Sequence, residues 1–460
     1  MVSQSRSDGT AGVKFSSRLA FVFAAVGAAV GLGNVWKFPY LAGENGGAAF
    51  VLVYLLGLLL VALPIFIAEV VIGRRGAASP PEALRRQAVE HGRSPRWRIP
   101  GILGLFAGLL IMSFYSVVAG WTFDYLLHTA DGSLTALDGA GTVAHFEALQ
   151  ASLPRLFLWQ GVFILLTLGI VAKGVTFGIE RAVGIMTPAL GVLLVILVGY
   201  ALTAGDSARA LAYLFSPDFS RLTPSVMLAA IGQAFFSLSV GIGGVMMYGA
   251  YLPRGASILR TSAYVALADT AVALLAGIAI FPIVFANGLD PAGGPGLVFI
   301  TLPLAFSAMP FGAVIGTIFF FFLILAALTS AIALYEPTVA WLAERGIGRG
   351  RGVLVAAGLS WLMGIASILS FNLWRDWHPL GFIERFAKAT PFDLITQGID
   401  TLVLPLGALV IAYFAGRLLP AEASRSEFGA GDAHGYRLWR MAVRWVTPAL
   451  ILLLFGASIL

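Results

Sequence analysis

The stretch "GLGNVWKFPYLAGENGG", residues 31–47, decides the fold. It continues an apolar run, residues 19–30, that is typical of a membrane helix, yet it contains glycines, a proline, a lysine, a glutamate and two asparagines. A helix interrupted inside lipid is tolerated only where its freed backbone groups find other partners. Freed carbonyls can ligate a hard cation, and freed N–H groups at the start of a half-helix can hold a carboxylate. The stretch therefore predicts a binding site inside the membrane.

Composition supports a membrane protein. Of 460 residues, 59% are hydrophobic and 11% are charged, far from the values of soluble domains. The apolar runs are about 20 residues long without period-2 alternation, which predicts a polytopic all-α protein and excludes a β-barrel. The first helix begins near Phe15 without a cleavage motif, so we expect it to be retained. The absence of cysteine excludes disulfides, thiol catalysis and thiolate metal sites.

Eleven spans are predicted. They cover 15–40, 47–74, 98–128, 154–172, 177–204, 223–251, 258–288, 311–345, 350–371, 393–418 and 438–459. Residues 74–98 hold seven arginines and residues 129–153 hold only acidic charges, so the positive-inside rule predicts a cytoplasmic N-terminus and an outer C-terminus.

The arginine-bearing loops account for the net charge of +6 without a nucleic-acid partner. The five histidines are expected in loops. Residues 288–303 predict a short re-entrant or surface-lying helix.

Two spans share an unusual feature. Span one contains "AVGAAVGLGN" (25–34) and span six contains "SLSVGIGG" (237–244). Close helix packing explains a spacing such as Gly27-xxx-Gly31, but two glycines flanking one residue suit an unwound segment better. The first and sixth spans are corresponding members of two five-helix halves, 15–204 and 223–418, with an extra helix at 438–459. Paired interruptions of this kind indicate an inverted-repeat transporter with its site at the midplane.

The motifs resemble one family closely. "GLGNVWKFPYLAGENGGAAF", "GQAFFSLSVGIG", "GPGLVFITLP" and "LTSAIALYEP" are similar to signatures of the neurotransmitter:sodium symporter family over about residues 15–416. The resemblance implies a LeuT-type fold of one domain, residues 1–460, with a 5+5 inverted repeat, broken helices one and six, and an eleventh helix, as in the shorter bacterial amino-acid transporters. It also implies a bacterial inner-membrane location.

Two sodium sites are implied by the resemblance. The second sodium site of the family corresponds to Gly27, Val30, Ala326, Thr329 and Ser330, an oxygen-only set that suits a hard ion. Back-bonding to the i−4 carbonyl is the alternative role for such hydroxyls. The first sodium site corresponds to Ala29, Asn34, Ser237 and Asp269.

Asp269 departs from the usual asparagine of the family. The chloride-site positions of other members correspond to Tyr54, Gln233, Ser237, Asp269 and Ala273. A carboxylate at Asp269 supplies the negative charge that chloride supplies elsewhere, so we expect chloride-independent transport. Its protonation on the return step would give proton counter-transport, which the sequence leaves open. Intramembrane acids are functional by default.

A substrate pocket is also implied. It corresponds to Ala28, Ala29, Leu32, Gly33, Ile111, Tyr115, Phe236, Ser237, Ser239, Ile242, Ser330 and Leu334. Tyr115 is expected to donate its hydroxyl to the substrate carboxylate. Gly31 stands where monoamine carriers have aspartate, which leaves room for the substrate's own carboxylate. The aliphatic walls and the lack of an obvious buried charge predict a neutral, mainly hydrophobic amino acid, with aromatic side chains also accommodated.

The gates differ from the family pattern. Lys37 replaces the outer arginine and lacks its bidentate fork. Thr396 aligns with the usual gate aspartate of the family and carries no charge. We therefore expect Lys37 to pair with Asp400, which lies one helical turn further in. Tyr115 and Phe236 are expected to form an aromatic lid beneath this ion pair. At the inner face Glu344 matches the family acid, and Lys14 is a possible substitute cation.

Three residues are given structural roles. Glu69 is expected to accept hydrogen bonds from the unwound part of span six. Gly178 and Pro188 match a spacing that would let the inner half of span five unwind.

The sequence therefore predicts sodium-coupled uptake of neutral, mainly hydrophobic amino acids by alternating access, with two sodium ions and no chloride. It does not predict an enzyme, because no catalytic motif is present, and no P-loop for a nucleotide is found. An ion channel or a transporter-like amino-acid sensor on the same fold is the alternative.

Overall fold

The computed structural model describes residues 14–428 and 432–459, and this part of the chain is helical without β-strands. The first five predicted spans and their connections form α1 (Arg18–Ala29), η1 (Gly33–Lys37), α2 (Phe38–Glu44), α3 (Ala48–Gly57), η2 (Leu58–Ala62), α4 (Leu63–Gly76), α5 (Pro80–Glu90), η3 (Pro95–Trp97), α6 (Arg98–Ala130), α7 (Gly139–Ala151), α8 (Leu153–Val171), η4 (Val175–Glu180) and α9 (Arg181–Ala204).

The rest of the chain repeats this alternation of long and short helices. It forms α10 (Ser207–Phe215), η5 (Phe219–Arg221), α11 (Pro224–Ser237), α12 (Gly244–Tyr251), α13 (Ile258–Ala286), η6 (Leu297–Thr301), α14 (Leu302–Ser307), α15 (Gly312–Glu344), α16 (Arg349–Leu369), η7 (Glu384–Phe386), α17 (Pro391–Gly398), η8 (Ile399–Val403), α18 (Leu404–Tyr413), η9 (Phe414–Leu418), α19 (Ala421–Arg425), α20 (Ala433–Met441), η11 (Ala442–Val446) and α21 (Thr447–Ile459).

Nine helices of the described chain are long and apolar enough to cross a membrane. A tenth span is the bent pair of α1 with η1 and α2, which turns by 47° at the break. The remaining predicted span, 223–251, is divided between α11 and α12, which are both short. The multi-pass, all-α fold class is confirmed, and the two predicted interruptions are found in the first and sixth spans.

The centre of the bundle is formed by α6 and α15, which pack along each other. Buried residues make up 72% and 78% of their apolar windows, against 28% for the η4–α9 span and 22% for the span from α20 to α21. The central helices therefore carry side chains that face other helices, while the peripheral helices present apolar side chains to lipid.

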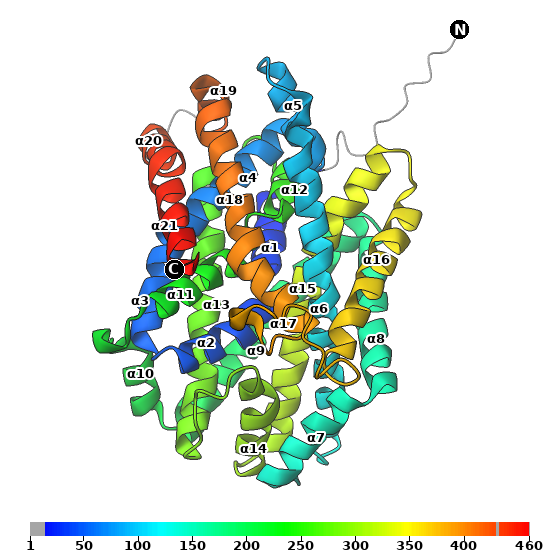
Figure 1. The fold of residues 1–460 in the computed structure, drawn as a ribbon, viewed down its shortest axis with the longest axis vertical. Helices are drawn as coiled ribbons and strands as arrows, with labels where there is room; N and C mark the ends of the chain where they lie inside the picture. Colours follow the sequence, from blue (N-terminus) through cyan, green and yellow to red (C-terminus); the bar gives the residue numbers. More distant parts are fainter. Residues whose placement is uncertain (1–13, 429–431, 460) are drawn as a thin grey trace.

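Several of the short helices lie at the two ends of the bundle. Figure 1 places α5, α19 and α20 at one end and α7, α10 and α14 at the other. Local sequence explains their starts: Asp138 accepts a hydrogen bond from Gly141 N at the start of α7, and Thr390 and Asp393 form a capping box for α17. The expected short helix near 288–303 is η6 with α14, which begins at Leu297 and ends at Ser307.

The expectation that all histidines lie in loops is wrong. His128 lies in the last turn of α6, His145 in α7 and His434 in α20. The predicted span 98–128 already reached His128, while His145 and His434 lie outside the predicted spans, because helical hydrogen bonding continues into polar sequence where a capping residue is available.

Candidate functional site

The break in the first span frees carbonyl oxygens beside the middle of α15. α1 ends at Ala29, and its C-cap Val30 has extended backbone angles. Ser330 Oγ lies 3.4 Å from Gly27 O, 3.2 Å from Ala28 O and 3.4 Å from Val30 O. Hydroxyl and carbonyl oxygens from two helices therefore converge on one point.

Thr329 completes this oxygen cluster. Its Oγ1 lies 2.9 Å from Ala326 O and 3.4 Å from Val30 O. It also lies 3.3 Å from Leu325 O, the i−4 carbonyl, so the back-bonding alternative is present in the same side chain. The structure brings together all five residues predicted for the second sodium site, and their oxygen-only set fits a hard cation such as sodium.

A second polar cluster joins η1, α11 and α13. Asn34 Nδ2 lies 2.7 Å from Asp269 Oδ1 and 3.2 Å from Ser237 Oγ. Ser237 Oγ in turn donates to Asp269 Oδ2 at 2.5 Å. All three side chains are fully buried. Ala29, the fourth predicted ligand of the first sodium site, is the last residue of α1 and lines the adjacent cavity.

Two of the residues at the predicted chloride positions, Tyr54 and Ser237, contact the Asp269 carboxylate. Tyr54 OH lies 3.2 Å from Ser237 Oγ and 3.4 Å from Asp269 Oδ2. Gln233 Nε2 donates to Gly33 O at 2.7 Å, and Ala273 is buried one turn after Asp269 on α13. The carboxylate is thus part of the same hydrogen-bond network as the hydroxyls that would face chloride.

A small cavity lies between the two breaks, and its free volume is about 20 Å³. A volume of this size holds about one water molecule, so an amino acid fits only after wall side chains move. The cavity is lined by Ala29, Gly31, Gly33, Ile111, Tyr115, Phe236, Ser239, Ile242, Ser330, Leu334 and Leu404.

Nine of these lining residues belong to the predicted pocket. Ala28 lines a neighbouring cavity instead, while Leu32 and Ser237 do not line the central one. Leu404 was missed, because it comes from the tenth span, where no motif marks the site. That Leu404 lines the cavity could have been inferred only from the way span ten packs against the break of span six.

Tyr115 connects three segments at this cavity. Its hydroxyl accepts from Leu32 N and donates to Ala327 O, both at 3.4 Å. These are long hydrogen bonds, so a carboxylate that reached the hydroxyl would replace weak partners.

Above the cavity, Lys37 contacts two other segments. Its Nζ lies 2.5 Å from Asp400 Oδ2 and 4.0 Å from the centre of the Phe236 ring. Thr396 donates to the backbone of its own helix, and Asp393 belongs to the cap of α17. The ion pair is therefore made by Asp400, as expected. Lys37, Tyr40 and Asp400 also help to line a second cavity, of about 320 Å³.

Comparisons with known proteins agree with this geometry. A family model described as the sodium:neurotransmitter symporter family matches residues 13–141 and 153–460. The chain belongs to this family. It is 36% identical over 452 residues to the "uncharacterized sodium-dependent transporter YhdH" of Bacillus subtilis, covering 96% of this chain and 97% of that protein. It is 33% identical to an uncharacterized sodium-dependent transporter of Haemophilus influenzae, with 97% and 98% covered.

A solved structure of the family has the same fold. The crystal structure of MhsT in complex with L-phenylalanine is 41% identical and superposes with a TM-score of 0.88, covering 97% of this chain and 99% of that one. The chain is therefore a sodium-dependent, multi-pass membrane transporter with the LeuT-type fold.

The break in the sixth span of this symporter is held by Glu69 from α4. The fully buried carboxylate accepts hydrogen bonds from Gly241 N at 2.6 Å and Met246 N at 3.1 Å. One acid thus binds the backbone on both sides of the turn into α12, as the sequence predicted.

The acid predicted for the inner gate of this symporter, Glu344, contacts the start of α5. Glu344 accepts hydrogen bonds from Ser79 N, at 2.8 Å, and from Ser79 Oγ. Lys14 is exposed, and its pairing with Glu344 stays a prediction. The contact with Ser79 arises because α5 begins at Pro80 and brings its N-cap Ser79 to the end of α15.

Gly178 and Pro188 lie in one continuous span. Gly178 is part of the π-helical η4, and Pro188 lies inside α9. A proline removes one helical hydrogen bond, and a single π-helical turn interrupts the regular α-helical pattern. The segment from Gly178 to Pro188 therefore departs from regular α-helix at both of its ends.

Proposed function

We propose that this transporter couples sodium entry to the uptake of neutral, mainly hydrophobic α-amino acids, aliphatic or aromatic, by alternating access. The observation that supports this most is the cavity between the two breaks. Ser330 lines it and also contacts the carbonyls of Gly27, Ala28 and Val30. A sodium ion and a substrate would therefore both contact Ser330, so the binding of one could change the affinity for the other.

The cavity chemistry supports this substrate class. Its described lining has aliphatic side chains at Ile111, Ile242, Leu334 and Leu404 and no charged side chain. A charged substrate side chain would be left unpaired there, which is costly in a buried site. Tyr115 also lines the cavity, and its hydroxyl would donate to the substrate carboxylate. The L-phenylalanine bound to MhsT, a relative of 41% identity, is an example of the class.

Uptake into proteoliposomes tests this proposal. Labelled leucine or phenylalanine should accumulate with an inward sodium gradient and not when potassium replaces sodium. Competition by the twenty amino acids should rank neutral hydrophobic ones first. Sodium current without solute flux would instead indicate a channel, and binding without flux a sensor.

We also propose that two sodium ions are transported, one at each oxygen cluster. Ser330→Ala and Asp269→Asn should each raise the sodium concentration needed for half-maximal uptake. The ratio of radioactive sodium moved to substrate moved in wild type measures the sodium count, and a ratio of one would contradict two sites.

Chloride-independent transport is proposed from the place of Asp269. The negative charge of its carboxylate, which accepts hydrogen bonds from Asn34 and Ser237, would repel a chloride ion beside it. Replacing chloride by gluconate should leave uptake unchanged, while Asp269→Asn should create or strengthen a chloride requirement. A pH-sensitive dye inside the vesicles would report proton exit during uptake, which is expected if Asp269 returns protonated.

We propose that the end of the bundle carrying α5 is cytoplasmic and that the end carrying α7 faces outward, as in a bacterial inner membrane. The single domain would then consist of repeats 15–204 and 223–418. The chain has no cysteine, so Ser94→Cys and Ser133→Cys provide single labelling sites at opposite ends. An impermeant thiol reagent on cells should label the Ser133→Cys variant only.

A further inference from the structure

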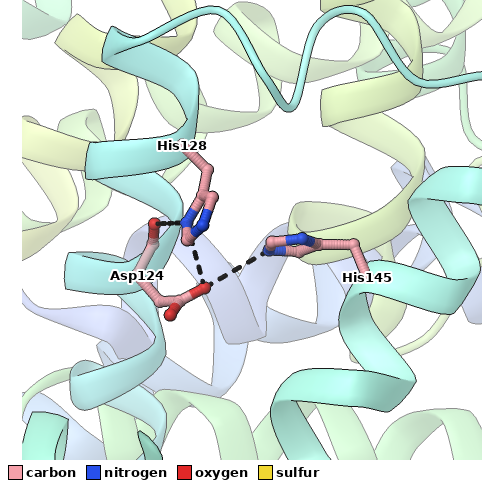
Figure 2. Close-up of side chains that lie close together, drawn as sticks. All are labelled: Asp124, His128 and His145. Atoms are coloured by element: carbon pink, nitrogen blue, oxygen red, sulfur yellow. Dashed lines mark hydrogen bonds and ion pairs between the residues drawn. The ribbon is translucent and has the colours of Figure 1, made fainter.

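A cluster of three side chains lies at the outer end of α6, away from the cavity. Figure 2 shows Asp124 and His128, one helical turn apart on α6, facing His145 from α7. One possible ligand atom from each of the three lies within 4.8 Å of the others. Positions i and i+4 of a helix point to the same side, and α7 supplies the third group across a gap.

The distances match the edges of a metal coordination polyhedron. Asp124 Oδ2 lies 3.3 Å from His145 Nε2 and 3.4 Å from His128 Nδ1. Zinc binds histidine nitrogen and carboxylate oxygen at about 2.0–2.2 Å in a tetrahedron, so its ligand atoms lie roughly 3.3–3.5 Å apart. Two of the three edges therefore have the required length.

The contact of His145 with the Asp124 carboxylate is a long one. His145 Nε2 lies 3.3 Å from Asp124 Oδ2 and is buried without a hydrogen bond of good geometry, and its side chain is 14% exposed. Buried polar atoms are normally hydrogen-bonded, so a ligand shared with the carboxylate would satisfy this nitrogen better than the 3.3 Å contact does. His128, with a side chain 37% exposed, provides a path from solvent.

The other carboxylate oxygen is held in place by neighbours. Asp124 Oδ1 accepts from Trp159 Nε1 at 2.9 Å and Arg155 Nε at 3.2 Å. Such partners orient a ligating carboxylate. Arg155 Nη2 also lies 2.7 Å from Oδ2, and its charge opposes that of a metal ion. A weak, reversible site is therefore expected rather than a permanent structural one.

We propose that Asp124, His128 and His145 form a binding site for a divalent transition-metal ion, zinc above all, with water as the fourth ligand. His128 exchanges its 2.8 Å contact with the Asp124 carbonyl for the metal. The ion ties α7 to α6. Because Phe146, the next residue on α7, stacks on Phe299 of η6, the ion also restrains the helix that covers the outer face.

Cobalt titration of the purified, tag-free transporter tests the site, because tetrahedral Co²⁺ absorbs visible light. The chain has no cysteine, so thiolate binding cannot imitate the signal. We expect one Co²⁺ per chain, displaced by Zn²⁺. His145→Ala and, separately, the more exposed His128→Ala should each weaken binding at least tenfold.

Two further variants separate ligation from folding. His145→Cys should restore zinc binding through a thiolate, which a purely structural role of the imidazole would not do. His434→Ala, an exposed histidine on α20, is the matched control and should bind as wild type does. Absence of cobalt absorption at millimolar concentration, or equal binding by wild type and both alanine variants of the cluster, would overturn the proposal. This readout does not depend on transport, so it stands apart from the function proposed above.

Discussion

The break in the first span and the break in the sixth both place glycines between two half-helices, but the glycines serve different purposes. Gly31 and Gly33 do not have positive φ angles. A Cβ on Gly31 would meet Ser330 Oγ and, at 3.0 Å, Tyr115 OH, while a Cβ on Gly33 would meet the Phe236 ring at 2.9 Å. Glycine in the first break therefore leaves space for neighbouring side chains.

The sixth break depends on backbone conformation instead. Gly241 has a φ of +92° and Gly243 a φ of +84°, and Ser239 also has a positive φ of +53°. L-residues rarely adopt this region. The comparison teaches that one break is shaped by its surroundings and the other by its own dihedral angles and by Glu69. Substitutions in the two breaks should therefore fail in different ways.

The largest effect is expected for Glu69→Ala. The change leaves Gly241 N and Met246 N buried without their acceptor, at about 1–3 kcal/mol for each unsatisfied group. Thermal unfolding in detergent should show a loss of several kcal/mol, and sodium-dependent uptake should disappear. Glu69→Gln keeps one acceptor oxygen and should lose less. Wild-type stability in the alanine variant would mean that the sixth break holds itself without this acid.

Gly241→Ala should have the next largest effect. A side chain at this φ costs about 1–3 kcal/mol, and its Cβ would lie 2.5 Å from Leu404 O. We expect a lower melting temperature together with reduced uptake. The matched control is Gly232→Ala inside α11, where a Cβ meets nothing within 4 Å. That variant should be equally stable or up to about 1 kcal/mol more stable.

Gly31→Ala should reduce function more than stability. The added methyl group displaces Ser330 Oγ from the carbonyls of the first break, so the sodium concentration for half-maximal uptake should rise about tenfold, equal to roughly 1.4 kcal/mol. The melting temperature should change little, because no backbone strain is added. A large loss of stability with unchanged sodium dependence would reverse the comparison between the two breaks.

Asp400→Asn is expected to have the smallest effect. The side chains of Lys37 and Asp400 are 12% and 24% exposed, and partly exposed ion pairs contribute at most about 1 kcal/mol. Substrate affinity should fall a few fold, and bound substrate should dissociate faster. Lys37→Arg should be tolerated if the outer gate needs only a cation. Unchanged affinity and dissociation in Asp400→Asn would show that the pair does not act as a gate.

Much of this fold could be predicted because breaking a helix inside lipid is costly, so the residues that break one stand out in an apolar sequence. Glycines in two otherwise apolar spans indicated the breaks, and Glu69 was the acid that matched the freed N–H groups of the sixth. The reason for Gly31 and Gly33 could not be predicted in the same way. Their crowding comes from Ser330, Tyr115 and Phe236, which lie far away in the sequence.

Other features depend on packing that no local pattern encodes. Leu404 reaches the cavity because α18 lies against the sixth break. Ser79 N donates a hydrogen bond to the Glu344 carboxylate because α5 starts beside the end of α15. His145 meets Asp124 only because α7 folds back over α6. Each of these contacts joins two segments that are far apart in the sequence, and neither segment contains a motif that indicates the contact.

Lys37 has a consequence for the timing of transport. Its ammonium touches Asp400 in η8 and the Phe236 ring in α11, and the neighbouring Trp36 donates to Pro295 O in the outer cover. Four segments therefore meet at two consecutive residues of one π-helical turn. Opening toward the outside is expected to be a single cooperative event, in which the lid, the tenth span and the cover are released together, and its kinetics should follow one exponential rather than a succession of steps.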